Sequence, residues 1–250
     1  MKISATIITL NEERNIERCI RSLLPVVDEV VVLDSFSTDR TEEICRSLGV
    51  RFEQRMWEGY AQTKNHLNAL ATHDIILSVD ADEALDEELQ NVISSLKEVE
   101  NTVYSVNRLT NYCGKWIKHS GWYPDIKVRL FPKEHCCWTG AYVHEELFVP
   151  DNYKAVQLPG HLLHYSYYDF EDHRSRADKY SSLTAQKMNA AGKSASILKP
   201  YLSGITRFIS MYFIKSGYLD GKMGFKIAQI SAASNVFKYK ELRRLNKEND

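Results

Sequence analysis

The chain has 250 residues, of which 44% are apolar and 26% are charged, and it is therefore long enough to bury a large hydrophobic core. Lysine and arginine total 32 and aspartate and glutamate total 33, so the net charge of -1 provides no overall positive field for a nucleic-acid backbone. We therefore expect no nucleic-acid partner.

The cysteines and the N-terminal segment indicate the compartment. The five cysteines include no CxxC pair, which favours a reducing environment. The apolar stretch at the N-terminus is too short for a signal peptide, and no window reaches about 18 uncharged apolar residues. We expect a cytoplasmic protein that does not span a membrane.

Strand-like and helix-like segments alternate over the first hundred residues. Residues 3–10 are rich in β-branched residues and end at Asn11, and the helical apolar spacing that follows predicts a helix with Asn11 as its N-cap. Residues 29–34 form a second apolar strand, and Asp39 with Glu42 resembles a capping box ahead of a second helix. The same reasoning predicts a strand at 50–55, a helix at 60–71, a strand at 73–80 and a helix around 89–96.

This alternation is typical of an α/β fold in which right-handed crossovers build a mostly parallel sheet. Asn11, Asp34 and Asp80 each follow a predicted strand, and ligands of such sheets bind beyond the carboxyl ends of the strands. We therefore expect these three side chains to meet at one rim. Residues 101–165 read as a mixed β region, and the chain from about 170 onward reads as helical, with breaks at Pro200, Gly217 and Gly221.

The acidic pair of Asp80-Ala81-Asp82 directly follows the strand at 73–80. Two carboxylates this close repel each other, and a divalent cation relieves the repulsion. An oxygen-rich site with few protein ligands suits Mg²⁺ or Mn²⁺ shared with a diphosphate. The alternative is that both acids only satisfy backbone N–H groups of a turn.

Four short motifs follow one another at the ends of these segments. They are Thr9 to Glu12 (TLNE), Asp34 to Asp39 (DSFSTD), Gly59 to Asn65 (GYAQTKN) and Asp80 to Asp82 (DAD). In this order they resemble the inverting nucleotide-sugar glycosyltransferases of family 2. Further segments are similar to the bacterial members that add hexoses to the lipopolysaccharide core, namely WYPDIKVRLF (122–131), VHEEL (143–147), HYS (164–166) and GYLDGKMGF (217–225).

The resemblance implies an α/β fold of the Rossmann-like GT-A type, with a mostly parallel sheet, a mixed β half that brings the acceptor and a helical C-terminal extension. We expect a catalytic domain over residues 1–192 and the extension over 193–250. The implied reaction moves a hexose, glucose in particular, from a UDP-sugar donor to a lipid-linked saccharide acceptor such as lipopolysaccharide core.

The resemblance also assigns the donor site. Asp34 would accept a hydrogen bond from the uracil imide, Asp82 would bind the metal, and Asp80 would face the ribose or the metal. The remaining residues assigned to nucleotide-sugar binding by these motifs are Thr9, Asn11, Glu12, Asp39 and Lys64.

An inverting reaction needs a base that takes the proton of the acceptor hydroxyl while the nucleoside diphosphate leaves. Glu145 matches the acid of the family's His-Glu segment, and its neighbour Glu146 would point to the opposite side of an extended segment. Asp125 in the WYPD segment is the alternative base, and spacing alone does not decide between them.

Three further residues have both a functional and a structural interpretation. His164 either coordinates the metal or is a buried histidine with satisfied nitrogens. Arg174 either clamps phosphate or belongs to a solvated helix face. Trp122 either stacks on a sugar or belongs to the core, and its place in a Gly- and Pro-bounded loop favours the sugar.

The charge of the chain is unevenly distributed: residues 193–250 carry +7 and residues 1–192 carry -8. Two apolar stripes at helical spacing, one over 202–213 and one over 223–237, are interrupted or followed by lysine and arginine. Such helices lie on anionic bilayers, which predicts peripheral attachment to the inner face of the cytoplasmic membrane. The alternative is that both stripes dock on the catalytic domain or on a partner subunit.

Two other functions fit parts of the pattern. A phosphohydrolase with an aspartyl nucleophile would use the acids of SVDADEA, but that motif needs Thr or Val where Ala84 stands. A catalytically inactive nucleotide-binding adaptor would keep the fold and recruit partners through the tail. The acids Asp80, Asp82 and Glu145 favour an enzyme over an adaptor.

Overall fold

The computed structural model describes residues 1–97, 100–140 and 145–248. The backbone divides into two compact units, one formed by residues 1–109 and 125–165 and the other by residues 110–124 and 166–250. This division differs from the boundary expected after residue 192, because the helix before that residue packs within the second unit.

The first unit carries most of the strands. Its elements are β1 (Ile3–Thr9), α1 (Ile16–Leu23), β2 (Glu29–Asp34), α2 (Thr41–Ser47), β3 (Arg51–Gln54), α3 (Tyr60–Leu70), β4 (Ile75–Asp80), β5 (Glu83–Leu85), α4 (Glu87–Ser95), β8 (Ile126–Pro132), β9 (Cys137–Thr139) and β10 (Glu146–Phe148). Two long strands, β6 (Thr102–Tyr112) and β11 (Lys154–Tyr167), begin in this unit and end in the second.

The main sheet has a parallel half and a mixed half. Strands β3, β2, β1 and β4 lie side by side and are parallel, and the order then continues through β8, β6, β11 and β5. The pairs β4–β8, β8–β6 and β11–β5 are antiparallel, and β9 pairs with β10 in a separate small sheet. The predicted α/β fold with a parallel sheet and a mixed β region is confirmed.

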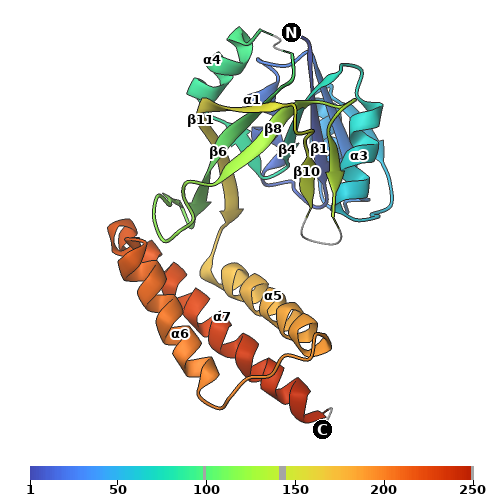
Figure 1. Cartoon of the computed structure of the whole chain (residues 1–250). Helices are drawn as coiled ribbons and strands as arrows, with labels where there is room; N and C mark the ends of the chain where they lie inside the picture. Colours follow the sequence, from blue (N-terminus) through green and yellow to red (C-terminus); the bar gives the residue numbers. More distant parts are fainter. Residues whose placement is uncertain (98–99, 141–144, 249–250) are drawn as a thin grey trace. The chain divides into compact units, whose positions relative to one another are not determined.

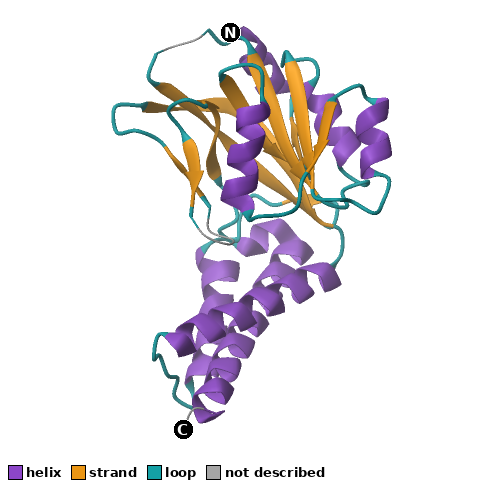
Figure 2. Ribbon diagram, turned by 90° about the vertical axis from the view of Figure 1, so that its right-hand side faces the viewer, coloured by secondary structure: helices purple, strands orange, loops and turns teal. Residues whose placement is uncertain are grey.

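Helices cover both faces of the parallel half, because successive side chains of a buried strand point to opposite faces. Ile7 of β1 is fully buried in one cluster with Ile20 of α1. The next residue, Ile8, packs instead with Leu33 and with Leu67 of α3. Figure 1 shows α1 and α3 on different sides of the strands, and Figure 2 looks onto the sheet from the α3 side.

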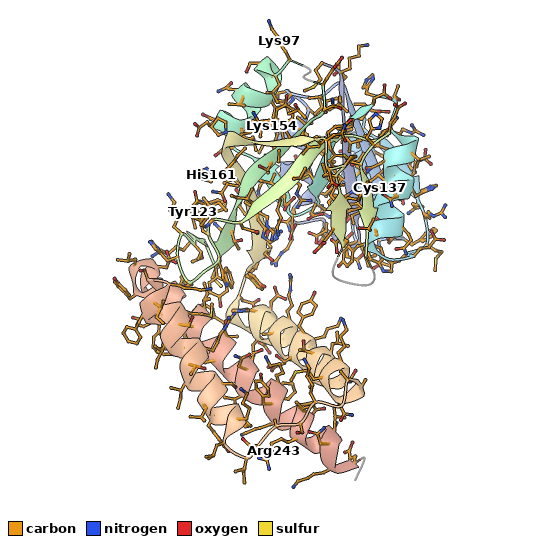
Figure 3. The ribbon with its side chains drawn as sticks, viewed as in Figure 1. Lys97, Tyr123, Cys137, Lys154, His161 and Arg243 are labelled. Atoms are coloured by element: carbon orange, nitrogen blue, oxygen red, sulfur yellow. The ribbon has the colours of Figure 1, made fainter. Side chains whose placement is uncertain are left out.

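The start of α4 is held against β11 of the mixed half. Asp86 is its N-cap, and one carboxylate oxygen accepts a 2.8 Å hydrogen bond from Leu89 N. The other oxygen accepts a 2.9 Å hydrogen bond from the backbone N of His161 on β11. Figure 3 labels His161. Gly160 has a φ of +85°, and a β-carbon there would lie 2.5 Å from Leu89 N, so only glycine fits. This junction sets the register in which β11 passes β5.

The two helix caps predicted from the sequence need correction. Helix α1 begins at Ile16 rather than directly after Asn11, whose φ is +56° and whose side-chain oxygen accepts a 2.8 Å hydrogen bond from Thr38 N. Asp39 is not a capping box partner, because its carboxylate accepts from the backbone N of Thr41 inside the same turn. Both side chains hold strand-end turns in place instead of capping a helix.

The second unit is helical. It contains β7 (Lys115–Trp116), α5 (Phe170–Ala190), α6 (Lys199–Ile209), the π-helical turn η1 (Ser210–Ile214), the 3-10 turn η2 (Gly217–Asp220) and α7 (Gly221–Glu248). Helix α7 packs against both α5 and α6, as Figure 1 shows. The helical breaks predicted at Pro200, Gly217 and Gly221 are confirmed, since Pro200 lies in the first turn of α6 and the two glycines begin η2 and α7.

Two buried polar groups organise this unit. Asp220, whose exposed fraction is 3%, accepts hydrogen bonds from the backbone N of Lys118 and of His119, and His119 Nδ1 lies 3.0 Å from the same carboxylate. His173 is also buried, and its Nδ1 forms a 2.7 Å hydrogen bond with the hydroxyl of Tyr112. Burial lowers the pKa of His173 to about 4.

No helix within residues 1–97, 100–140 and 145–248 combines the length and the apolar character that crossing a membrane requires.

The lowered pKa of His173 predicts that acid weakens the fold. Below the ordinary value of 6.5 the unfolded chain binds a proton at this histidine, whereas the folded chain does so only near pH 4, so stability falls across this window. The loss attributable to this group reaches about 3 kcal/mol. Urea unfolding of the wild type and of His173→Gln over this range measures it.

The variant should be less stable at neutral pH, since it lacks the contact with Tyr112, but should lose less stability on acidification. His135→Gln is the matched control, because His135 is exposed and its loss should leave the pH dependence unchanged. Parallel curves for wild type and His173→Gln would contradict the assignment.

Candidate active site

The strand-end residues expected to converge lie at one edge of the sheet. In the register of the parallel strands, Thr9 at the end of β1 is opposite Asp34 of β2, and Ile8 is opposite Asp80 of β4. The backbone N of Asn11 donates a 2.8 Å hydrogen bond to Ser37 Oγ in the turn after β2. The expectation that the polar residues after these strands meet at one rim is confirmed.

Asp34 is completely buried at this rim. Its carboxylate accepts hydrogen bonds from the backbone N and the hydroxyl of Ser37 and from the Gln54 amide. An ionised carboxylate has about four lone-pair sites, so room for one further donor remains. The neighbouring Thr9 hydroxyl is buried and has no hydrogen-bond partner among the residues that the structure describes.

Glu12 and Asp39 join the turns after β1 and β2. The backbone N of Glu12 donates to Thr41 Oγ1 at 2.8 Å, and its carboxylate accepts from the Asn15 amide. Asp39 accepts a 3.0 Å hydrogen bond from the backbone N of Glu13. These hydrogen bonds hold the two loops together at the rim.

Asp80 is held between two cations. Its Oδ1 lies 3.0 Å from Lys64 Nζ, and its Oδ2 accepts a 2.8 Å hydrogen bond from the buried guanidinium of Arg129. Burial alone would raise the pKa of Asp80, but Arg129 and Lys64 outweigh burial and hold the pKa well below its usual range. Asp80 is therefore a permanent anion whose two oxygens are already engaged.

Glu83 is a second acid beneath the acidic pair. It has no exposed side-chain area, it lies 2.7 Å from the Arg129 guanidinium, and it accepts a 2.9 Å hydrogen bond from the backbone N of Asp80. Arg108 lies 3.5 Å from the other side of Glu83. Burial lowers the pKa of Arg129, while Asp80 and Glu83 raise it by more, so the arginine stays charged. Glu83 thus fixes the turn that carries Asp80 and Asp82.

Asp82 points away from this network and pairs with His164. Asp82 Oδ2 lies 3.2 Å from His164 Nε2, because His164 on β11 is in register with Glu83 of β5. An Asp oxygen suits Mn²⁺ or Mg²⁺ when a diphosphate supplies further oxygens, and an imidazole nitrogen beside it suits Mn²⁺ better than Mg²⁺. Within the described residues no group of three or more His, Cys, Asp or Glu side chains is arranged as a metal site. Asp82 and His164 are thus two side chains of a type that can ligate a metal, whereas both oxygens of Asp80 are engaged by Lys64 and Arg129.

Lys64 is positioned by the motif that contains it. Gly59 has a φ of +109° and precedes α3, which then presents Lys64 toward the acidic pair. Asn65 exchanges two 2.8 Å hydrogen bonds with the backbone of Trp138 on β9, and the Lys64 ammonium lies 4.5 Å from the centre of the Trp138 ring. These contacts of Asn65 and Lys64 with Trp138 hold the small β9–β10 sheet beside the rim.

Glu145 also lies beside Lys64. Its Oε1 is 3.7 Å from Lys64 Nζ, so the carboxylate shares a cation with Asp80, and its side chain is 22% exposed. Glu146, the next residue, is exposed at the start of β10. Residues 143–144 of the VHEEL segment lie outside the described residues.

Asp125, the alternative base, is bound by two other cations. Arg108 Nη2 lies 2.7 Å from Asp125 Oδ2 and Lys127 Nζ lies 3.1 Å from Oδ1. Burial raises the pKa of Asp125, but Arg108 and Lys127 lower it by more. A carboxylate with a lowered pKa and occupied oxygens is a weak proton acceptor, so this geometry disfavours Asp125 relative to Glu145.

Two predicted site residues, Trp122 and Arg174, belong to the second unit. Trp122 is half-buried and packs against the rings of Tyr112, Tyr167 and His173. Arg174 is exposed on α5 and lines a groove of about 880 Å³ between α5 and α7. Their assignment to sugar and phosphate binding stays a prediction.

Sequence reasoning missed four charged residues of the site. Arg129 and Glu83 form the buried ion pair, Arg108 links Glu83 to Asp125, and Arg18 of α1 places its guanidinium 3.8 Å from the ring centre of Tyr165, beside His164. One signal for Arg129 was available: a charged residue within the apolar strand KVRLF needs a buried partner.

Comparison with known proteins identifies relatives of the chain. Residues 4–145 match glycosyl transferase family 2. An uncharacterized glycosyltransferase of Rickettsia typhi is 31% identical over 98% of this chain and 88% of its own length. The lipopolysaccharide core biosynthesis glycosyltransferase LpsC of Rhizobium meliloti is 26% identical over 93% of this chain and 91% of its own.

Among solved structures, glucosyl-3-phosphoglycerate synthase of Mycobacterium tuberculosis, in complex with Mn²⁺, uridine diphosphate and glucosyl-3-phosphoglycerate, is 28% identical with a TM-score of 0.36. That match covers 44% of each chain, so this chain spans less than half the length of that enzyme.

The buried position of Arg129 predicts a large effect on stability. Arg129→Met leaves Asp80 and Glu83 without their shared cation, and breaking a buried pair in this way costs about 3–5 kcal/mol. Lys127→Met on the same strand removes an exposed cation and should cost less than about 1 kcal/mol. Urea unfolding at neutral pH measures both.

Adding Glu83→Gln to Arg129→Met removes one of the stranded charges and should recover part of the loss. If the double variant is as unstable as the sum of the single variants, the two residues are not coupled as described.

Proposed function

Because this chain belongs to glycosyltransferase family 2 and has the GT-A type of α/β fold, we propose that it transfers a hexose from a UDP-sugar to a lipid-linked saccharide, with inversion at the anomeric carbon. The observation that carries the proposal is that the carboxylates of Asp80 and Glu145 lie 3.0 Å and 3.7 Å from the Lys64 ammonium group. Asp82, the second acid of the pair, contacts His164. This arrangement brings a proton acceptor and a diphosphate-binding edge to the same rim.

The strand-end turns support a nucleotide donor. Asp34 has capacity for one more hydrogen bond, and the neighbouring Thr9 hydroxyl has no hydrogen-bond partner within the described residues. In this proposal the uracil imide donates a hydrogen bond to the Asp34 carboxylate. Asn11, Glu12 and Asp39 then act indirectly, by holding the shape of the rim that receives the nucleoside.

A divalent ion fits the edge formed by Asp82 and His164. These two side chains would hold Mg²⁺ or Mn²⁺, and the ion would neutralise the charge of the departing diphosphate. Lys64 and Arg129 already neutralise Asp80, so Asp80 adds little repulsion toward a diphosphate.

Glu145 acts as the base in this proposal. An acceptor hydroxyl is a poor nucleophile at neutral pH, and a positioned carboxylate accelerates its attack by about 10² to 10⁴. As the hydroxyl oxygen bonds to the anomeric carbon, Glu145 takes its proton and the bond to the diphosphate oxygen breaks. The Lys64 ammonium lies between the carboxylates of Glu145 and Asp80 and holds the two acids at one place.

The acceptor is inferred from the relatives of the chain and from the charge of residues 193–250. The Rhizobium relative is a lipopolysaccharide core biosynthesis glycosyltransferase that aligns over 93% of this chain, which supports a saccharide on a lipid carrier as the acceptor. Residues 193–250, with their excess of lysine and arginine, support work at an anionic membrane surface on the cytoplasmic side.

The two rival functions have weaker support. An aspartyl phosphohydrolase needs a free nucleophilic carboxylate, whereas both oxygens of Asp80 are engaged by Lys64 and Arg129. An inactive adaptor has no need for Glu145 at the Lys64 ammonium. Binding of uridine diphosphate without any turnover of a UDP-sugar would favour the adaptor.

The proposed base is tested with a neighbouring matched pair. Glu145→Gln keeps the volume but cannot accept a proton, so the transfer rate should fall at least about a hundredfold while the affinity for the UDP-sugar stays near the wild-type value. Glu146→Gln should retain most of the rate. If Asp125→Asn abolishes transfer and Glu145→Gln remains active, the base is Asp125.

The metal edge is tested by calorimetry. Asp82→Ala should remove most of the gain in uridine diphosphate affinity that Mn²⁺ gives the wild type, about tenfold or more, and should lower turnover by orders of magnitude. Asp74→Ala removes an exposed acid at the opposite end of β4 and serves as the control. Turnover that resists a chelator would refute the metal assignment.

A further inference from the structure

Helix α6 leaves one long apolar face exposed. Leu202 and Ile205 are each 57% exposed, and the side chains that share their face continue it along the whole helix. The exposed apolar residues of this outer face are Leu198, Tyr201, Leu202, Ile205 and Ile209. Beyond the helix, Phe213 and Ile214 of η1 and Tyr218 and Leu219 of η2 are exposed as well.

The opposite side of α6 is already packed. Gly204 is buried, and a β-carbon there would lie 2.5 Å from the Val236 side chain of α7, so the two helices touch closely at this point. Pro200 and Met211 are buried too. The outer face is therefore not the face through which α6 joins the helices of its own unit.

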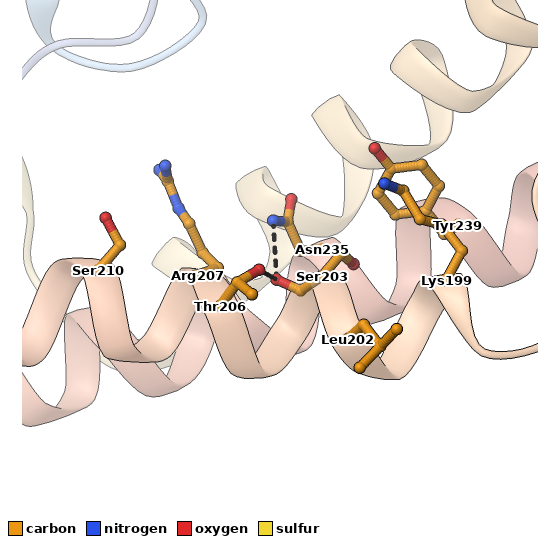
Figure 4. Close-up of a pocket in the computed structure, with 8 residues that line it drawn as sticks. All are labelled: Lys199, Leu202, Ser203, Thr206, Arg207, Ser210, Asn235 and Tyr239. Atoms are coloured by element: carbon orange, nitrogen blue, oxygen red, sulfur yellow. Dashed lines mark hydrogen bonds between the residues drawn. The ribbon is translucent and has the colours of Figure 1, made fainter.

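A polar groove of about 470 Å³ runs beside the outer face, between α6 and α7 (Figure 4). Lys199 and Arg207 of α6 line it together with the hydroxyls of Ser203 and Thr206 and with Tyr239 of α7. Leu202 lines the groove and also belongs to the outer face, so the two surfaces are continuous.

The groove is electropositive. Lys199 and Arg207 form no ion pair with any residue that the structure describes, and the Lys199 ammonium lies 5.4 Å from the Tyr239 ring centre. Burial lowers the pKa of nearby Lys238, and the charges of Arg207 and Lys199 lower it further. Residues 179–219 contain six lysines and arginines and no aspartate or glutamate.

We propose that the outer face of α6 inserts into the headgroup layer of an anionic bilayer and that the adjoining groove binds a lipid phosphate. Apolar side chains beside uncompensated cations are the combination by which a helix lies in a bilayer interface. Arg207 supplies guanidinium donors for phosphate oxygens, and Lys199 supplies ammonium donors. The hydroxyls of Ser203 and Thr206 donate instead to the backbone carbonyls of Pro200 and Ser203.

The charge pattern favours a bilayer over a second copy of the chain. A symmetric dimer through the outer face would bring the two copies of Lys199, Arg207 and Lys215 toward one another without any acid on this stretch to compensate them. An anionic membrane compensates these charges directly. The groove belongs to the second unit and shares no residue with the proposed transfer chemistry. The inference therefore names the surface by which the chain would work at a membrane, and its test does not depend on that chemistry.

Sedimentation of the full chain with vesicles tests the apolar face. Wild type should partition into equimolar phosphatidylglycerol and phosphatidylcholine vesicles at about 0.1 M salt and much less into pure phosphatidylcholine. The double variant Leu202→Glu, Ile205→Glu should lower the partition coefficient by at least about tenfold. Leu183→Glu, at an exposed leucine of α5, should change it less than about twofold.

The groove is tested with Lys199→Gln, Arg207→Gln, against Lys187→Gln on α5 as control. The double variant should lower binding to the anionic vesicles by about tenfold, and inorganic phosphate at equal ionic strength should not displace the wild type. Displacement by phosphate would mean that the groove binds a free anion. Equal binding to both vesicle types, or loss of binding in the control, would overturn the proposal.

Two measurements keep these outcomes interpretable. Unchanged melting temperatures verify that the variants are folded, and unchanged uridine diphosphate binding separates a failure of membrane docking from a failure of the transferase assignment. Self-association of the wild type that Leu202→Glu, Ile205→Glu abolishes, without vesicle binding, would show that a second copy covers the face.

Discussion

The active-site rim depends on the burial of one guanidinium group, that of Arg129, between two acids. Asp80 and Glu83 both lie within hydrogen-bond distance of it, and Glu83 also holds the backbone of Asp80. Two charged groups buried in a sheet, Arg129 and Glu83, are tolerated only because each has an opposite partner, since an unpaired buried charge is costly. Through this ion pair, β8 of the mixed half fixes the turn after β4 of the parallel half.

Neutralisation of Asp80 determines what the remaining acids do. With Asp80 tied to Lys64 and Arg129, the second acid of the pair, Asp82, turns toward His164 instead. Lys64 has a second acidic neighbour, Glu145, from a segment that is distant in the sequence. The site therefore keeps the Asp82–His164 pair separate from the acids that share Lys64, namely Asp80 and Glu145.

The charged groups of the helical unit are arranged differently. It buries the carboxylate of Asp220 against His119, while Lys199 and Arg207 of α6 line a groove without an ion-pair partner among the residues that the structure describes. The same helix leaves its apolar residues exposed while its small residue Gly204 faces α7. A helix that exposes large apolar side chains and buries a glycine is organised for a partner outside its own unit.

The sequence by itself determined the alternation of strands and helices, because hydrophobic period and strand-end turns are local properties. It also placed Asn11, Asp34 and Asp80 at one rim, because parallel strands bring their carboxyl ends together. It misjudged Asn11 and Asp39 as helix caps, since their actual partners, Thr38 across the loops and Thr41 within its own turn, depend on the path of the loop. Only the tertiary structure decided that Arg129 and Glu83 form the buried pair, that Asp125 is occupied by Arg108, and that Glu145 joins Lys64. These contacts join residues far apart along the chain, and neither propensity nor spacing carries information about which buried charges meet.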